Sequence, residues 1–167
     1  METCYLLFGS NLGEKNAIFE QACLYINNRC GRIVAMSSAY ESEPWGFDAQ
    51  DWFLNRLIVL ETELLPDALM TELLDIEAVL GRVRHPESRG YASRPIDLDI
   101  LYYGQKVLHT EKVIAPHPRL HQRRFVLEPL CEICPDFVHP VVHCTNSELL
   151  SRCEDALEVR KMPPSNK

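Results

Sequence analysis

The chain has 167 residues, of which 46% are hydrophobic and 25% are charged, and its formal net charge is −7. This length and composition favour one folded domain with its own core and exclude a disordered chain. The acidic balance argues against a general nucleic-acid binder, which usually carries a basic surplus, and no apolar run reaches the roughly 18 residues of a membrane span.

The hydrophobic patterns predict a regular order of elements in the first half of the chain. The segment GSNLG, from Gly9 to Gly13, is predicted as a turn, and Gly31 is placed to end the first helix. In chain order we expect a strand over 3–9, a helix over 14–29, a strand over 32–40, a loop over 41–52 and a strand over 53–63.

The pattern continues with a second helix that begins at 65–67 and ends at Gly81. A loop over 82–95 leads into the strand DLDILYYG, and Gly104-Gln105 predicts a hairpin into 106–108. The C-terminal third reads as more helical, and 161–167 reads as a flexible tail.

The resulting order is strand, helix, strand, strand, helix, strand. It predicts an α/β (α+β) fold with a ferredoxin-like antiparallel sheet and both helices packed on one face. No repeat or linker divides the chain, so we expect a single domain over 1–160, followed by the tail.

Seven cysteines are scattered along the chain, and METCYLLFGSN lacks the basic and long apolar regions of a signal peptide. We therefore expect reduced thiols and a cytoplasmic protein. The spacing of Cys131 and Cys134, followed by His139, His143 and Cys144, leaves a zinc site open as an alternative. Free thiols are favoured, because a second cysteine pair is absent.

Two acids interrupt the apolar strand RPIDLDILYYG. Asp97 and Asp99 are two residues apart, so on a strand their carboxylates point to the same side, roughly 6 Å apart. At that distance, two charges repel by roughly 3 kcal/mol at an effective dielectric constant of about 20. A divalent cation would remove this repulsion, and Mg²⁺ is usually held by carboxylates, waters and phosphates. The alternative is a pair of acids on a solvated strand face.

The loop before this strand is rich in arginine. Arg82, Arg84, Arg89 and Arg94 fall within 13 residues of an otherwise acidic chain. The planar guanidinium suits phosphate oxygens, although a solvated basic loop is the simpler alternative. Only Tyr91 offers a stacking surface there, which disfavours single-stranded nucleic acid as a ligand. Arginines beside paired acids are typical of phosphoryl or pyrophosphoryl transfer, and no Walker loop is present.

Four motifs carry a more specific likeness. GSNLGEK, SEPWGFDAQDWFLN, SRPIDLDILYYG and APHPRLHQRRFVLEPL follow one another between about residue 3 and about residue 140. In this order and at these spacings, the chain resembles the 6-hydroxymethyl-7,8-dihydropterin pyrophosphokinases of the folate pathway. The resemblance implies a ferredoxin-like α/β core and transfer of the β,γ-pyrophosphoryl group of ATP to the hydroxymethyl oxygen of the dihydropterin, with AMP as the second product.

The resemblance also implies a pterin site. Phe53 and Phe125 match the aromatic pair that sandwiches the ring, and Asn55 matches the amide that hydrogen-bonds its edge. The resemblance also implies that Asp97 contacts the edge of the pterin ring. The residues that match the loop closing over the pterin are Ser42, Pro44, Trp45 and Gly46.

The nucleotide and metal sites follow in the same way. Asp97 and Asp99 match the ligands of two Mg²⁺ ions, which are the expected cofactors with ATP as co-substrate, and Arg82 and Arg94 complete the catalytic set. The ATP-contacting positions are matched by Glu77, Arg82, Arg84, Arg94, Lys112, His117 and Arg123, with Ile114 as a weaker contact.

A second class of function stays open at this point. A ferredoxin-like module that senses a nucleotide or a metal without turnover would be stabilised by its ligand but would form no product. In either case we expect small-molecule ligands, no nucleic-acid or membrane partner, and a monomer.

Overall fold

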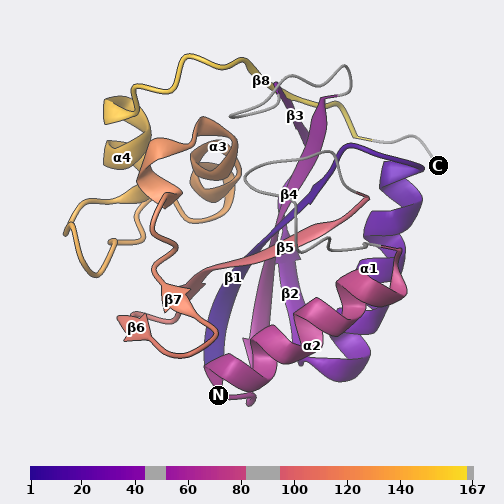
Figure 1. The fold of residues 1–167 in the computed structure, drawn as a ribbon. Helices are drawn as coiled ribbons and strands as arrows, with labels where there is room; N and C mark the ends of the chain where they lie inside the picture. The colour runs from indigo at the N-terminus through magenta and orange to yellow at the C-terminus, as the bar shows by residue number, and fades with distance from the viewer. Residues whose placement is uncertain (44–51, 82–94, 165–167) are drawn as a thin grey trace.

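The computed structural model describes residues 1–43, 52–81 and 95–164 (Figure 1). None of the helices in these ranges is long and apolar enough to cross a membrane. The elements are β1 (Glu2–Ser10), α1 (Lys15–Arg29), β2 (Arg32–Met36), β3 (Tyr40–Ser42), β4 (Phe53–Thr62), α2 (Pro66–Val79), β5 (Asp97–Tyr103), β6 (Leu108–His109), β7 (Ile114–Ala115), the 3-10 helix η1 (Leu120–Gln122), α3 (Arg124–Ile133), α4 (Asn146–Arg152) and β8 (Val159–Lys161).

The main sheet has the strand order β5-β1-β4-β3-β8, and β2 also pairs with β4. β1 is antiparallel to β4 along its whole length, from Glu2 opposite Thr62 to Ser10 opposite Leu54. Its other edge pairs antiparallel with β5, so β1 is bonded on both sides. The predicted antiparallel α/β fold is therefore confirmed.

Helices α1 and α2 cover one face of this sheet (Figure 1). Leu6 and Phe8 of β1 are buried there with Ala22 and Ile26 of α1 and Leu73 of α2. Burying a side chain such as Leu73 stabilises the fold by about 1.5–3 kcal/mol. The prediction that both of these helices pack on one face is confirmed, because the apolar residues of α1 and α2 meet alternate residues of the strands.

Helices α3 and α4 cover the opposite face (Figure 1). Leu7 of β1 and Leu57 of β4 are buried there against Leu127 and Leu130 of α3 and Leu149 of α4. The C-terminal third is helical, as expected, and it closes the second layer of the core. The sheet is thus buried on both faces, which leaves its strand ends for polar residues.

The predicted hairpin after β5 is wrong. Gly104 does form a turn, but β6 pairs with β7 in a separate two-stranded sheet and not with β5. The outer edge of β5 bonds to a later part of the chain, since the His117 N–H donates to the Leu101 carbonyl over 2.9 Å. That bond brings the segment after β7 against β5.

The strand predicted over 32–40 is two strands, and the loop predicted over 41–52 begins with the end of β3. The break has a local cause. The Leu57 N–H donates to the Ser37 hydroxyl over 2.8 Å, and two N–H groups of the Arg56 guanidinium donate hydrogen bonds to the Ser37 carbonyl. The Ser37 N–H still donates to the Leu57 carbonyl over 3.0 Å, but the Leu57 N–H and the Ser37 carbonyl are bonded to side chains, so the ladder is interrupted there.

The tail predicted over 161–167 begins too early. Lys161 pairs with Tyr40 in the β3–β8 ladder, and the Met162 N–H donates to the Ala39 carbonyl over 2.8 Å. Backbone hydrogen bonds therefore hold Lys161 and Met162 to the sheet. Residues 165–167 lie outside the described residues.

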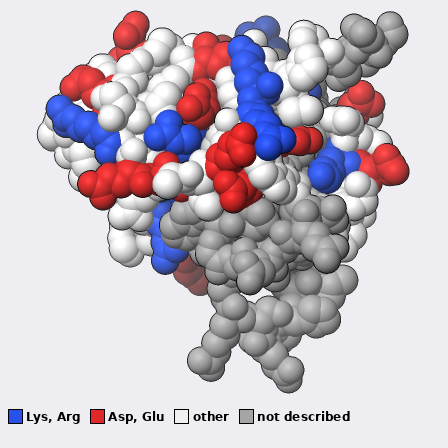
Figure 2. All heavy atoms as spheres, turned by 90° about the horizontal axis from the view of Figure 1, so that it is seen from above, with Lys and Arg blue, Asp and Glu red and all other residues white. Residues whose placement is uncertain are grey.

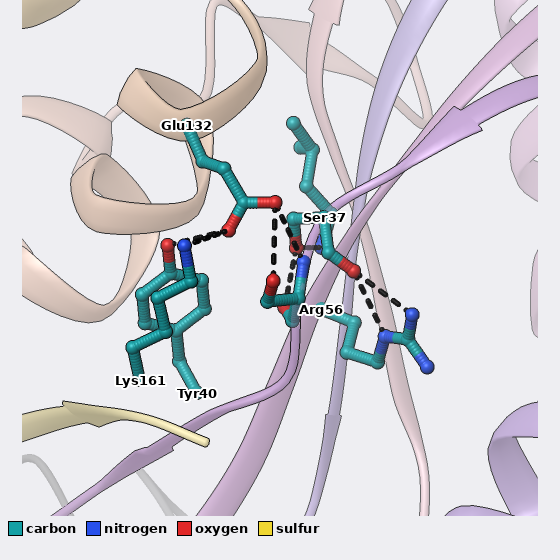
Figure 3. Close-up of polar contacts among 7 residues, drawn as sticks. Ser37, Tyr40, Arg56, Glu132 and Lys161 are labelled. Carbon is teal, nitrogen blue, oxygen red and sulfur yellow. Dashed lines mark hydrogen bonds and ion pairs between the residues drawn. The ribbon is translucent and has the colours of Figure 1, made fainter. Parts of the chain in front are cut away.

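Glu132, near the C-terminal end of α3, links that helix to the edge of the sheet (Figure 3). Its carboxylate accepts hydrogen bonds from the Tyr40 hydroxyl over 2.7 Å and from the Ser38 N–H over 2.8 Å. The Lys161 ammonium lies 3.4 Å from the same carboxylate. One side chain thus ties α3 to β3, to β8 and to the β2–β3 connection.

These partners also set the charge state of Glu132. Partial burial acts to raise its pKa, but the hydrogen bonds from Tyr40 and Ser38 and the charge of Lys161 outweigh burial and hold the pKa below 4.5. A carboxyl whose pKa is lower in the folded state stabilises the fold above pH 4.5, and that stabilisation is lost as the pH falls through the folded pKa.

We predict that Glu132→Gln lowers the melting temperature by about 2–6 °C at pH 7, because an amide replaces charge-assisted bonds. The difference from wild type should shrink as the pH is lowered below 4.5, where Glu132 itself becomes protonated. Thermal denaturation across pH 3–8 measures both effects. Glu128→Gln, on the same helix, is the control and should change little; a pH-independent difference at Glu132 would contradict the assignment.

Candidate active site

Three residues on neighbouring strands lie in one row across the sheet. Gly9 of β1 is paired with Asn55 of β4 on one side and with Asp97 of β5 on the other. Paired residues of adjacent strands project to the same face, so all three share the α3 side of the sheet with Leu7. Asp99 is opposite Leu7 and follows Asp97 on that face. Both acids are partly buried, as the apolar flanks of the strand suggest.

Two more of the predicted pterin residues extend this row. Phe53 precedes Asn55 by two residues on β4 and is opposite Ser42 of β3, so both side chains share the same face. Ser42, Phe53 and Asn55 are all buried. The sheet therefore gathers Ser42, Phe53, Asn55 and Asp97 on adjacent strands, although they are far apart in the sequence.

The orientation of the Asn55 amide is fixed by its neighbours. Its Nδ2 donates to the Ser42 hydroxyl over 2.8 Å and lies 3.4 Å from the carbonyls of Tyr40 and Phe53. An amide oxygen in that position would face two carbonyl oxygens, so the nitrogen must occupy it. The oxygen Oδ1 is consequently turned toward Gly9 as a hydrogen-bond acceptor.

The start of α3 brings an aromatic ring and a cation to the same layer. Phe125 is partly buried and packs against the core between α3 and the sheet, and the guanidinium of Arg123 lies 5.6 Å from the centre of its ring. Burial lowers the pKa of Arg123 to about 10, against an opposing effect of Asp155, so the side chain remains charged at neutral pH.

His117 is placed beside β5 by its backbone bond to Leu101. Its Nδ1 accepts a hydrogen bond from the Arg119 N–H over 3.2 Å, so the neutral ring carries its proton on Nε2. Burial lowers the pKa of His117, while the negative charge of Asp97 acts in the opposite direction. The ring is therefore suited to donate one hydrogen bond from Nε2 as a neutral imidazole.

Glu77 lies at the C-terminal end of α2 and is almost completely buried, with 1% of its surface exposed. Its carboxylate accepts a hydrogen bond from the Leu98 N–H over 2.7 Å. Leu98 lies between Asp97 and Asp99 on the outer strand of the sheet. Glu77 therefore positions the strand that carries the two acids, a role that its sequence did not suggest.

The remaining predicted nucleotide residues lie on the β6–β7 side or outside the described ranges. The Lys112 ammonium donates to the Thr71 hydroxyl of α2 over 2.9 Å, and the side chain of Ile114 is exposed. Thr71 is six residues before Glu77, about 9 Å along the helix. The predicted residues outside the described ranges are Pro44, Trp45, Gly46, Arg82, Arg84 and Arg94.

No group of three or more His, Cys, Asp or Glu side chains that could hold a metal is found within 1–43, 52–81 and 95–164. This does not favour the zinc alternative at Cys131 and Cys134, and all seven cysteines are free thiols. Asp97 and Asp99 are two carboxylates on one face of β5. Such a pair fits Mg²⁺, which takes one or two protein carboxylates and completes its shell with water and phosphate oxygens.

The one face of the described residues that Figure 2 shows carries side chains of both charges. The described Lys and Arg side chains on this face lie beside Asp and Glu side chains (Figure 2). A nucleic-acid-binding face is usually a basic patch or stripe.

Comparison with known proteins identifies what this arrangement resembles. The family model described as 7,8-dihydro-6-hydroxymethylpterin-pyrophosphokinase (HPPK) matches residues 5–135. A Methylorubrum extorquens protein named 2-amino-4-hydroxy-6-hydroxymethyldihydropteridine pyrophosphokinase is 43% identical over 139 residues, which cover 83% of this chain and 86% of that protein. A Porphyromonas gingivalis protein of the same name is 37% identical, over 84% of this chain and 95% of its own length.

Longer proteins contain a similar segment. The folic acid synthesis protein of Pneumocystis carinii is 40% identical over 84% of this chain, but the match covers 18% of that protein. A crystal structure described as HPPK-DHPS in complex with substrates superposes with a TM-score of 0.73 at 14% identity, over 90% of this chain and 43% of that one. This likeness supports the fold.

We predict that Glu77→Leu lowers the melting temperature by about 2–6 °C, because the Leu98 N–H loses a buried acceptor. Glu77→Gln retains a carbonyl oxygen and should cost less. Thermal denaturation of both variants measures the difference. Equal melting temperatures for Glu77→Leu and wild type would show that the Leu98 contact does not hold the strand.

Proposed function

This chain belongs to the 7,8-dihydro-6-hydroxymethylpterin-pyrophosphokinase family, and from that premise we propose that it transfers the pyrophosphoryl group of ATP to 6-hydroxymethyl-7,8-dihydropterin in folate biosynthesis. The products are AMP and the dihydropterin diphosphate. The alternative of a sensing module without turnover is not supported, because relatives that are 37–43% identical to this chain are named as pyrophosphokinases.

The observation that carries this proposal is the row across β4, β1 and β5. It joins an aromatic and amide surface, Phe53 and Asn55, to the carboxylates Asp97 and Asp99 on one face. A flat heterocycle that stacks on Phe53 and bonds to Asn55 would extend toward the two acids. Its hydroxymethyl group would thereby meet phosphates held at the acids. We assign Phe125, at the start of α3, to the opposite side of the ring.

We assign the nucleotide to the side of β5 that His117 and Arg123 flank. The charged Arg123 guanidinium would contact phosphate oxygens, and His117 would donate from Nε2 to the same group. Arg82, Arg84 and Arg94 are assigned to the phosphates from the sequence, with Arg82 and Arg94 offsetting the charge that develops on the departing AMP. Lys112 and Ile114 are assigned to the outer part of the nucleotide.

We assign Asp97 and Asp99 as the ligands of Mg²⁺, with two ions as the expected number. When bound, the metal would neutralise phosphate charge and polarise the attacking hydroxyl. The role of the protein is to hold both carboxylates on one face, and Glu77 supports this by fixing the backbone of Leu98 between them. No separate general base is assigned.

We further propose that the protein acts as a monomer in the cytoplasm, with ATP and the dihydropterin as its partners. The free state of all seven cysteines supports a reducing compartment.

The direct test is to incubate the protein with ATP, Mg²⁺ and 6-hydroxymethyl-7,8-dihydropterin and to separate the nucleotides by chromatography. AMP should form in amounts equal to the dihydropterin diphosphate. Accumulation of ADP in place of AMP would contradict pyrophosphoryl transfer, and ligand-induced stabilisation without product would support the sensing module.

We predict that Asp97→Asn and Asp99→Asn each lower kcat by at least on the order of 10²-fold, because each removes one carboxylate from the metal-phosphate site. Circular dichroism should show an unchanged fold. Asp75→Asn, on the exposed side of α2, is the matched control and should retain wild-type activity. Retention of activity after both changes at once would exclude the metal role.

His117 allows a paired test of its two ring nitrogens. His117→Asn keeps an acceptor near Nδ1 for the Arg119 N–H but removes the Nε2 donor, so we predict a rise in the KM for ATP of about tenfold or more. His117→Gln keeps a donor near Nε2 and should raise this KM less. Steady-state kinetics at saturating dihydropterin measures both. The reverse order would show that the loop bond matters more than the phosphate contact.

A further inference from the structure

Ser42 and Phe53 are opposite each other where β3 ends and β4 begins. The ends of a ladder are the places where it opens most easily. The Ser42 hydroxyl accepts the hydrogen bond that orients the Asn55 amide, so the geometry of the row depends on this terminal pair. Glu43 follows Ser42 in the chain and Trp52 precedes Phe53. The contacts of Glu43 and Trp52 therefore affect how firmly the pair is held.

Strand β8, which lies beside β3 (Figure 1), and the residue before it contact both of these flanking residues. The Glu43 N–H donates to the Glu158 carbonyl over 3.2 Å, and the Glu158 N–H donates to the Glu43 carboxylate over 2.6 Å. The Arg160 guanidinium lies 4.5 Å from the centre of the Trp52 ring. The Trp52 carbonyl also accepts a hydrogen bond from the Lys15 ammonium of α1 over 3.1 Å. Contacts from outside β3 and β4 thus hold both sides of the terminal pair.

The guanidinium of Arg160 is oriented by Glu158. Its Nε and Nη2 donate to the two carboxylate oxygens of Glu158 over 2.9 and 3.3 Å. An exposed ion pair of this kind contributes little stability of its own, because water screens both charges. The pair does fix the direction of the planar guanidinium, and a guanidinium over an indole ring is a favourable cation–π contact.

Arg160 does not lie on the face that we assign to the ligands. It is opposite Glu41 in the β3–β8 ladder, and Glu41 is opposite Leu54 of β4. Paired residues project to the same side of a sheet, and Leu54 is buried in the layer of α1 and α2. Arg160 is therefore behind the sheet with respect to Ser42 and Phe53, and it can affect the ligand only through the residues that it holds.

We propose that Arg160 is a positioning residue for the dihydropterin. By holding Trp52 from behind the sheet, it keeps the neighbouring Phe53 paired with Ser42. The Asn55 amide, which Ser42 orients, is kept in place as a result. This inference rests on the proposed function, and it concerns a strand that lies beyond the matched part of the family model and outside all four motifs.

The test compares Arg160→Gln, which removes the cation, with Arg160→Lys, which retains one. At saturating ATP and Mg²⁺, the KM for the dihydropterin should rise about two- to fivefold in Arg160→Gln, which is the effect of one exposed cation–π contact, while kcat stays within about 1.5-fold of wild type. Arg160→Lys should lie closer to wild type than to Arg160→Gln. Calorimetric titration with the dihydropterin, in the presence of Mg²⁺ and a non-hydrolysable ATP analogue, should give the same order of Kd values.

Arg32→Gln is the matched control. Arg32 is also an exposed strand arginine in an ion pair, with Glu61 near the other end of β4. Glu61 is eight residues from Phe53, about 26 Å along the strand. Arg32→Gln should therefore leave the KM and Kd for the dihydropterin at their wild-type values.

A double variant tests whether Arg160 acts through Trp52. Trp52→Leu removes the ring on which the guanidinium lies. If the effect passes through this contact, Arg160→Gln should raise the KM for the dihydropterin no further in the Trp52→Leu background. Full additivity of the two changes would overturn the proposed route.

The outcomes separate this inference from the proposed function. An unchanged KM and Kd in Arg160→Gln, in a protein whose wild type forms AMP, overturns the inference alone. A lower melting temperature with unchanged dihydropterin binding, or a failure to fold, also overturns it, because either result indicates a purely structural role. Wild-type protein that binds the dihydropterin but forms no AMP refutes the transfer reaction, and the Kd comparison then decides the role of Arg160. Wild-type protein that does not bind the dihydropterin refutes both.

Discussion

The candidate site depends on one constraint, which is that β1 is hydrogen-bonded on both edges. Antiparallel pairing with β4 places Gly9 beside Asn55, and pairing with β5 places Gly9 beside Asp97. A shift of one residue in either register would send the side chain of Asn55 or Asp97 to the opposite face of the sheet. The ring-binding and phosphate-binding groups are therefore held together by the backbone ladder, and the apolar core on both faces keeps that ladder in register.

Two glutamates outside this row hold the neighbouring helix α3 and strand β5 in place. Glu132 fixes α3 to β3 and β8, so the helix that carries Phe125 in its first turn is anchored near its other end. Glu77 of α2 accepts a hydrogen bond from the Leu98 N–H on the outer edge of β5. The carboxylates of Glu77 and Glu132 position β5 and α3, whereas we assign Asp97 and Asp99 to the metal site. Glu77 and Glu132 accept backbone hydrogen bonds from Leu98 and Ser38, and Asp97 and Asp99 lie on the face that we assign to the ligands.

Much of the fold follows from local patterns. Apolar runs rich in strand-forming residues predicted β1, β4 and β5, and the apolar faces of α1 and α2 predicted the layer of helices on one face of the sheet. The errors arose where long-range contacts override local signals. The hairpin expected after Gly104 does not form, because the His117 N–H donates a hydrogen bond to the Leu101 carbonyl on the outer edge of β5. The strand over 32–40 is divided because Ser37 bonds to Leu57 and Arg56 across the sheet.

For the site, the sequence by itself determined the chemical groups. The period of two in DLD put two carboxylates on one face, and four motifs in order identified the family. Only the tertiary structure decided which residues meet. The meeting of Asn55 with Asp97 across Gly9 is set by strand register between segments that are more than 40 residues apart in the chain, and no local pattern encodes it. Glu77, which the resemblance assigns to the nucleotide, is also buried and accepts the Leu98 N–H, and only the tertiary structure shows this support of β5.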